Sequence, residues 1–211
     1  MQLEIIGAPQ SSFVRTVRIA LEEKGVAYRL TSAMPHSAEV EAIHPLGRIP
    51  VMRHGEVELF ESRAIAGYVD RVFPGLRLFP EDALGAARIE QWVSVCTSTI
   101  LPELNRYLQY FFFSGRQDGT PDEAGMAARL PEVRRLLQIL DRAVAKNGQL
   151  ATEDFSYADM NLLPVLYYLS DVVESAEVLA MLEHLPAYLT THAGRESVMA
   201  TRPPAFAERT G

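Results

Sequence analysis

The sequence predicts an α/β domain followed by an all-helical domain, and three observations lead to this prediction. Short apolar runs that suit buried strands alternate with helical patterns only in about the first 75 residues. From about residue 83 onwards, apolar residues recur only at helical spacing. Between the two regions, residues 76–82 read Leu-Arg-Leu-Phe-Pro-Glu-Asp, which is typical of a linker. We therefore expect domains over residues 1–76 and 83–211.

The α/β domain opens with a strand, a helix and a second strand. The apolar run Leu3–Ile6 suits a buried strand, and a Gly-Ala-Pro-Gln turn follows it. Apolar residues then recur at helical spacing from Phe13 to Leu21, and Lys24-Gly25 supplies a cation and a glycine at the helix end. Residues 26–30 form the next apolar run. Two strands joined by a helix are expected to be parallel, with a right-handed crossover.

A hairpin and a helix complete this domain. A polar connection over residues 32–43 includes a short helical pattern at 37–43. Strands at Val51–Met52 and Val57–Phe60 flank a turn at residues 54 and 55. The second strand runs directly into a helix over residues 61–73, which Pro74-Gly75 ends. The predicted order is βαβ-α-ββα, with a four-stranded sheet.

The rest of the chain has helical periodicity and no strand pattern. Two long segments and three shorter ones show apolar residues at helical spacing. The expected helices span residues 83–113, 121–147, 156–169, 172–182 and 187–193.

Composition excludes several classes of protein. Hydrophobic residues make up 48% and charged residues 22%, as in ordinary globular proteins, and the net charge of −7 argues against a nucleic-acid-binding surface. The single cysteine, Cys96, excludes an internal disulfide and a cysteine-based zinc site, and the five histidines lack metal-like spacing. No leader peptide pattern and no apolar run of about 20 residues is present. We expect a cytoplasmic protein without a metal or a membrane partner.

Ser11 and Ser12 are the first candidates for chemistry. They precede a helix, where unpaired N–H groups and the helix dipole favour an anion, including a thiolate. The alternative is that one serine is only the helix N-cap, and geometry alone favours it.

Two further candidates lie between residues 44 and 65. The Ile49-Pro50 bond is expected to be trans on frequency alone, and a cis bond would leave the Ile49 backbone free to pair with an extended peptide. Glu61 and Ser62 open a helix, where they serve either as ordinary first-turn residues or as a site for an amphoteric ligand. In that site Glu61 would pair with an ammonium group, and Ser62 with a carboxylate.

Two patterns are best explained by structure alone. Ser156 and Asp159 have the spacing of a capping box, which would start a core helix. Five aromatic residues between 107 and 113 cannot all face the core, so some are expected to line a cleft or an interface.

Together these segments resemble the cytosolic glutathione S-transferase family over nearly the whole chain. The predicted element order matches, and four motifs occur in the family's order and spacing. The motifs are Ser11-Ser12 with residues 17–25, His44 to Val51, Glu61 to Ile65, and Phe155 to Asp159.

The resemblance implies a thioredoxin-like first domain that binds glutathione as cosubstrate. By position, Ser11 matches the hydroxyl that stabilises the thiolate in serine-type classes. Ile49, before a cis Pro50, matches the residue whose backbone pairs with the cysteinyl part. Glu61 and Ser62 match the pair that binds the γ-glutamyl end, while Arg48 and His36 fall near the glycyl carboxylate. The resemblance also implies a homodimer.

The resemblance leaves the reaction partly open. It implies conjugation of the glutathione thiolate to a small, mostly apolar electrophile, with a glutathione-dependent isomerase or dehalogenase and a non-catalytic binding protein as alternatives. Phe13 stands where an isomerase-like branch has cysteine, and Glu61 where it has glutamine. The family usually has Asn at the position of His44, for which the sequence offers no interpretation. The electrophile is expected to contact Pro9, Gln10, Phe13, Tyr107, Tyr110 and Phe111.

Overall fold

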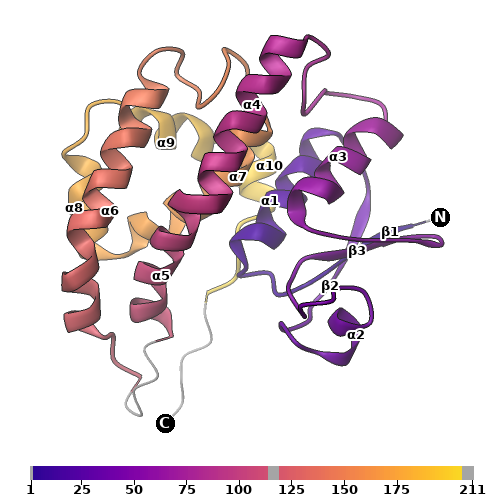
Figure 1. Ribbon diagram of the computed structural model, residues 1–211, viewed down its shortest axis with the longest axis horizontal. Coiled ribbons are helices and arrows are strands. Elements are labelled where there is room, and N and C mark those ends of the chain that lie inside the picture. The colour runs from indigo at the N-terminus through magenta and orange to yellow at the C-terminus, as the bar shows by residue number, and fades with distance from the viewer. Residues whose placement is uncertain (1, 114–118, 206–211) are drawn as a thin grey trace. The chain divides into compact units, whose positions relative to one another are not determined.

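A four-stranded mixed sheet is the centre of the first of two structural units. The computed structural model describes residues 2–113 and 119–205, which divide into one unit of residues 2–82 with 193–205 and a second of residues 83–192 (Figure 1). The strands lie in the order β2-β1-β3-β4; β2 is parallel to β1, and the other neighbours are antiparallel. The strands are β1 Leu3–Ile6, β2 Tyr28–Thr31, β3 Val51–His54 and β4 Val57–Phe60. The parallel pair and the hairpin are confirmed.

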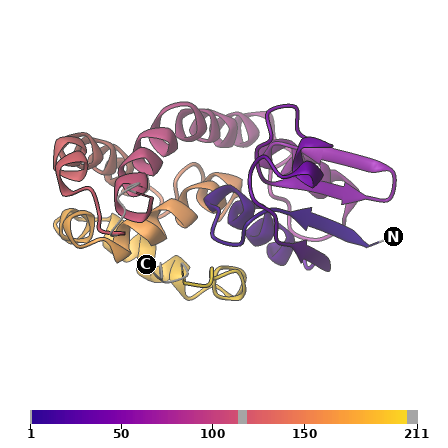
Figure 2. The same cartoon turned by 90° about the horizontal axis from the view of Figure 1, so that it is seen from below.

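Helices cover the two faces of this sheet with separate apolar clusters. Helices α1 (Ser12–Glu23) and α3 (Ser62–Val72) pack on the face that carries Leu3, Ile5 and Met52. The short helix α2 (Ala38–Glu41) places Val40 against Ile6 and Val51 on the opposite face. Because successive residues of a strand point to opposite faces, adjacent apolar residues supply both clusters. The hairpin of β3 and β4 projects beyond the helices in Figure 2.

Charges of alternating sign cross the sheet on the α2 face. Arg29 lies 2.6 Å from Glu4, and Glu4 is opposite Arg53 in the register, which lies 2.9 Å from Glu58. Glu39 of α2 lies 3.4 Å from Arg53. Opposite charges on directly facing strand positions stabilise the pairing, so this row supports the observed register.

A buried ion pair links the end of α1 to α3. Lys24 Nζ lies 3.1 Å from Asp70 Oδ1, and it also donates to the carbonyl oxygen of Leu76 at 2.8 Å. The same Asp70 oxygen accepts the N–H of Leu78 at 2.9 Å. Lys24 therefore does more than end its helix, because its hydrogen bonds also hold the segment that follows α3 in place.

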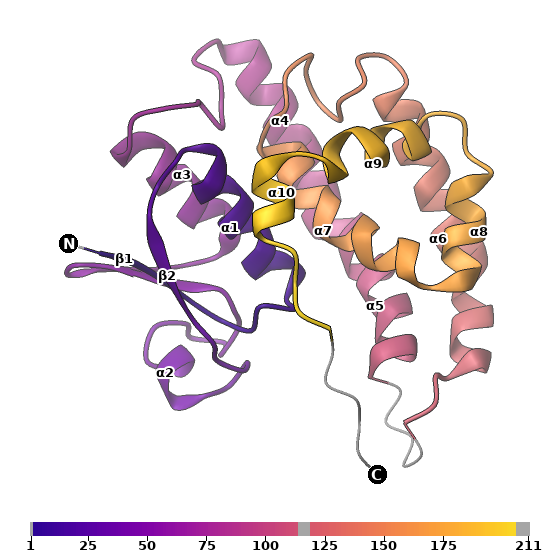
Figure 3. The ribbon, with the colours of Figure 1, turned by 180° about the vertical axis from the view of Figure 1, so that it is seen from behind.

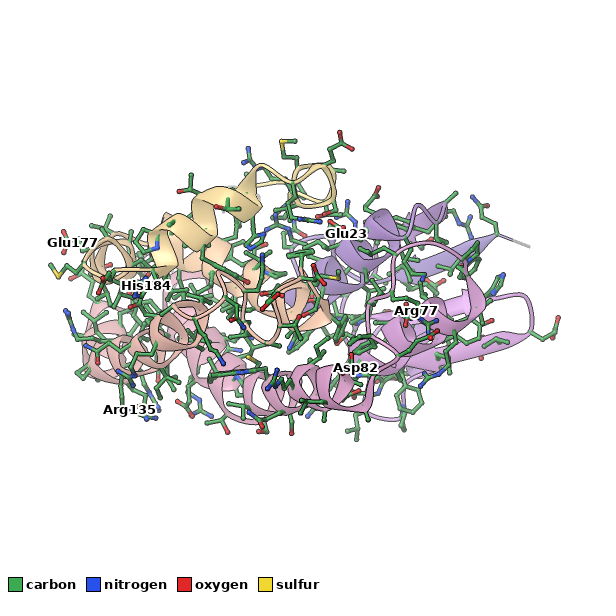
Figure 4. The ribbon with its side chains drawn as sticks, turned by 90° about the horizontal axis from the view of Figure 1, so that it is seen from above. Glu23, Arg77, Asp82, Arg135, Glu177 and His184 are labelled. Carbon is green, nitrogen blue, oxygen red and sulfur yellow. The ribbon has the colours of Figure 1, made fainter. Side chains whose placement is uncertain are left out.

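The first unit also includes a segment from the far end of the chain. Helix α10 (Glu196–Ala200) lies beside α1 in Figure 3. Arg195 donates to both carboxylate oxygens of Glu23 at 3.0 and 2.8 Å, and Figure 4 shows Glu23 directed at this segment. Arg15 donates to the carbonyl oxygen of Val198 at 3.1 Å. Sequence reasoning did not predict α10, whose five residues are too few for a clear period.

The second unit is helical, as predicted. The predicted helix over residues 83–113 contains a π-helical turn, in which the N–H of Leu101 bonds to the carbonyl oxygen of Cys96. Pro102 follows directly and has no N–H for the carbonyl oxygen of Ser98, which favours a change of hydrogen-bond pattern here. The elements are α4 Ala83–Val95, η1 Cys96–Ile100, α5 Leu101–Phe112, α6 Glu123–Val144, α7 Tyr157–Asp171, α8 Val173–Ala180 and α9 Leu185–Ala193.

Helix α7 is the core of this unit and begins with the predicted capping box. The Asp159 carboxylate accepts the Ser156 N–H at 3.0 Å and the Ser156 hydroxyl at 3.1 Å. It also accepts the Leu150 N–H at 2.8 Å and the Tyr188 hydroxyl at 3.0 Å. Across the described residues, no helix combines the length and the hydropathy that crossing a membrane would require.

Candidate functional site

One end of the sheet brings together the segments that the sequence singled out. In the register, Ile6 is opposite Val51, and Val51 is opposite Phe60. The end of β1, the start of β3 and the end of β4 therefore share one edge. The turn to Ser11, the Ile49-Pro50 bond and the Glu61-Ser62 junction each lie a few residues beyond this row.

Ser11 is the N-cap of α1, as the structural alternative predicted. Its hydroxyl oxygen accepts the Val14 N–H at 3.4 Å, and its own N–H donates to the carbonyl oxygen of Ala8 at 3.0 Å. Capping uses the hydroxyl as an acceptor, so its proton stays available as a donor. The first turn of α1 contains no acidic residue, so nothing there offsets the positive end of the helix dipole. Ser11 can therefore cap the helix and donate to an anion.

The Ile49-Pro50 peptide bond is cis, which confirms the family-based expectation over the frequency-based one. The half-buried Ile49 packs near the turn that leads to Ser11. A Cβ on Gly7 would lie 2.6 Å from Cγ2 of Val14 and 3.1 Å from Cβ of Ile49. Gly7 is thus enclosed between α1 and the loop before β3. Because glycine has no side chain, the two segments can lie close together here.

Glu61 and Ser62 form an uncapped start to helix α3. Glu61 has φ 68° and ψ 117°, a conformation rare for a residue with a large side chain, and its side chain makes no capping hydrogen bond. The Ser62 residue is buried, and no described residue hydrogen-bonds its hydroxyl. The first N–H groups of α3 therefore remain available for an anion, beside the carboxylate of Glu61.

His36 and Arg48 are brought together by the backbone of Gly47. The His36 N–H donates to the carbonyl oxygen of Gly47 at 2.8 Å. Gly47 has φ +60°, a left-handed backbone conformation that favours glycine. Both side chains are exposed, and His36 Nδ1 lies 3.3 Å from Glu41 Oε1. The loop thus presents two basic side chains near the cis bond.

The aromatic residues of α5 differ widely in exposure, as predicted. Tyr107 is fully buried, and burial raises the pKa of its hydroxyl. Tyr110 and Phe111 are half-buried, and Phe113 is 58% exposed. In the first unit, Pro9, Gln10 and Phe13 are half-buried around the start of α1. Contact of these residues with an electrophile stays a prediction.

His44 is the residue of this region that sequence reasoning missed. It is 2% exposed, and its Nε2 lies 3.4 Å from Oε1 of Glu61. A lone histidine after a short helix carries no sequence signal for this contact. Elsewhere in the described part of the chain, no three His, Cys, Asp or Glu side chains gather as a metal ion would need.

Comparison with known proteins decides the family. The model of the glutathione S-transferase N-terminal domain matches residues 5–77, and that of the C-terminal domain matches residues 102–196. Glutathione S-transferase 3 of Zea mays is 31% identical over 173 residues, which cover 78% of each chain. The chain belongs to the glutathione S-transferase family.

Solved structures of glutathione S-transferases share the whole fold. Poplar glutathione transferase F1 superposes with a TM-score of 0.86 at 27% identity, covering 95% of this chain and 96% of that one. Maize glutathione S-transferase I, solved with an atrazine–glutathione conjugate, superposes with a TM-score of 0.84 at 27% identity and the same coverage. The family therefore explains why a thioredoxin-like unit is followed by a helical unit.

Proposed function

We propose that this glutathione S-transferase is an active enzyme that joins the sulfur of glutathione to a small, mostly apolar electrophile. The observation that supports the proposal is the shared sheet edge, because the segments that contain Ser11, the Ile49 backbone and the Glu61-Ser62 junction all adjoin it. These groups match the parts of a tripeptide that has an ammonium group, two carboxylates and a thiol. The maize relative with a bound glutathione conjugate supports the same cosubstrate.

The glutathione-binding roles follow from the chemistry of each group. Glu61 would pair with the ammonium group of the γ-glutamyl end, while Ser62 and the first N–H groups of α3 would bind its carboxylate. Backbone groups of Ile49, beside Pro50, would pair with the cysteinyl part as a strand does. Arg48 and His36 would bind the glycyl carboxylate.

Ser11 would supply the catalytic step by stabilising the thiolate. A free thiol has a pKa of about 8.5, so only a few per cent is ionised at pH 7. A hydroxyl that donates to the sulfur, with the N-terminus of α1 beside it, favours the anion, and each pKa unit corresponds to about 1.4 kcal/mol. The thiolate forms a carbon–sulfur bond as the leaving group departs with its electron pair, and the thiol proton goes to solvent.

Replacement of Ser11 tests this role. Ser11→Ala should lower kcat by about 10- to 1000-fold, because a single stabilising donor to a reacting anion has an effect of up to that size. Ser12→Ala is the matched control and should keep the activity, since no described residue hydrogen-bonds the Ser12 hydroxyl. Glutathione consumption and product analysis should be followed together. Full activity of Ser11→Ala would disprove its role, and turnover without net glutathione consumption would indicate an isomerase.

The predicted electrophile contacts can be tested separately. If Tyr110 or Phe111 contacts the electrophile, replacement by alanine should raise KM for the electrophile and leave KM for glutathione unchanged. The same result is expected for replacement of Phe13 by alanine. Pro9, Gln10 and Tyr107 are the other residues predicted to contact the electrophile. An equal rise in both KM values would instead indicate damage to the fold.

A homodimer and a cytoplasmic location complete the proposal. Apolar side chains are exposed on α3 and α4: Val72 by 47%, Leu84 by 61% and Val95 by 40%. Such side chains favour an interface between copies of the chain. A reducing compartment suits an enzyme whose cosubstrate is a thiol. Sedimentation that shows only monomer at micromolar concentration would refute the dimer.

A further inference from the structure

His44 is held in one orientation by hydrogen bonds at the start of the loop before β3. Its N–H donates to the carbonyl oxygen of Val40 at 2.8 Å, and its carbonyl oxygen accepts the Gly47 N–H at 2.9 Å. Its ring nitrogen Nδ1 accepts the N–H of Leu46 at 3.0 Å. Because a nitrogen that accepts an N–H carries no proton of its own, these contacts assign the neutral tautomer with the proton on Nε2.

The other side of the ring faces Glu61. Nε2 lies 3.4 Å from Oε1 of Glu61, and the ring centre lies 4.7 Å from that of Phe60, the residue before it. The two partners differ in exposure, since the His44 side chain is 3% exposed and that of Glu61 is 61% exposed. A buried ring nitrogen that other hydrogen bonds hold in place therefore lies close to a carboxylate that is largely exposed to solvent.

Glu61 needs such a partner because its own backbone does not orient its side chain. Its φ of 68° places it outside the ordinary helical and extended regions, and its carboxylate caps no helix N–H. An exposed glutamate loses considerable side-chain freedom when it is fixed by a ligand. A donor that restricts the carboxylate before the ligand arrives lowers that cost.

We propose that His44 is a positioning residue for Glu61, which it orients through Nε2–H to receive the ammonium group of glutathione. The inference rests on the proposed function and adds a residue to it. A lysine or arginine in this place would cancel the charge of Glu61, whereas the neutral imidazole orients the carboxylate and leaves its charge for the ligand.

Two substitutions separate this role from support of the loop. The amide oxygen of Asn extends about as far as Nδ1, so His44→Asn can still accept the Leu46 N–H but presents no donor to Glu61. The amide nitrogen of Gln extends about as far as Nε2, so His44→Gln keeps the donor and loses the acceptor. Affinity for glutathione is measured by titration calorimetry, beside kcat, KM for the electrophile and the melting temperature.

We expect His44→Asn to weaken glutathione binding about fivefold, because the ligand alone must then restrict the Glu61 side chain. Its kcat, KM for the electrophile and melting temperature should not change, and His44→Gln should bind within about twofold of the wild type. In a Glu61→Gln background, His44→Asn should have no further effect. Wild-type affinity of His44→Asn, or an equal loss in the Glu61→Gln background, would overturn the proposal. If the wild-type protein itself does not bind glutathione, the proposed function falls as well.

Discussion

At the scale of single residues, polar groups of the proposed site belong to residues that also start helices of the fold. Ser11 caps α1 whether or not a ligand is bound, and Glu61 begins α3. The first turns of both helices contribute positive potential, because neither contains an acidic residue. The proposed site thus combines the capped start of α1 with the uncapped start of α3, and both helix starts lie beyond the same edge of the sheet.

Cys96, the single cysteine of the chain, allows a direct test of how burial affects the reactivity of a thiol. It is fully buried, and burial raises its pKa to about 12. At pH 8 only about one thiol in 10⁴ would then be ionised, and the thiolate is the reactive form. We expect no labelling by an aromatic disulfide reagent over minutes in the native protein. The unfolded protein should release one equivalent per chain, and rapid labelling of the native protein would contradict the burial of Cys96.

The residues of the site were not equally open to prediction. Glu61 and Ser62 directly follow a strand pattern, and Ser11 follows a strand and a short turn, so local sequence places all three at helix starts. The cis state of Ile49-Pro50 is not expected from frequency alone, and only the family motif indicated it. The contact of His44 with Glu61 joins residues 17 positions apart and depends on the sheet register, which no local pattern contains.

At the scale of elements, strands and long helices were predictable because their apolar periods are strong. The bounds of α1 and β4 agree with the pattern, and the second strand is shifted to Tyr28–Thr31. The π-helical turn η1 was missed because its residues continue the helical spacing on both sides. Helix α10 was missed because its position depends on distant partners such as Glu23. Pro102 favours the first of these two elements locally, whereas tertiary contacts hold the second.

Helix α7 gives an element-scale prediction through its capping residue. Burial raises the pKa of the Asp159 carboxyl, while hydrogen bonds from Leu150, Ser156 and Tyr188 oppose that shift. Asp159→Asn would turn one carboxylate oxygen into an NH₂ group that faces an N–H donor, whichever way the amide is placed. We expect a loss of about 2–4 kcal/mol in the free energy of unfolding, measured in urea.

Asp154→Asn is the matched control for this variant. Asp154 is exposed in the loop before α7, so its substitution should change the free energy of unfolding by less than about 0.5 kcal/mol. Equal effects of the two substitutions would show that the hydrogen bonds of Asp159 do not stabilise the start of α7.

At the scale of the whole molecule, the order of residues along the chain differs from the order of packing. Residues 193–205 follow the helical unit in sequence and pack with the α/β unit. The Glu23 side chain is only 10% exposed, and it accepts hydrogen bonds from Arg195 and the Ser197 hydroxyl. A division at residue 82 therefore removes partners of α1 from the unit that contains it.

This arrangement predicts that residues 1–82 are less stable alone than when they are joined to residues 193–205 by a flexible Gly/Ser linker. Without the segment, the carboxylate of Glu23 loses the guanidinium of Arg195, and the buried guanidinium of Arg15 loses the carbonyl oxygen of Val198. We expect the linked form to melt at a higher temperature, measured by far-UV circular dichroism. Arg195→Ala in the linked form should remove much of the gain, because a nearly buried carboxylate that loses its cation is costly. In the full chain, Arg195→Ala should lower the free energy of unfolding by about 2–3 kcal/mol. Adding Glu23→Gln to that variant should recover part of the loss. Equal melting of the two fragments would show that the α/β unit does not depend on the chain's far end.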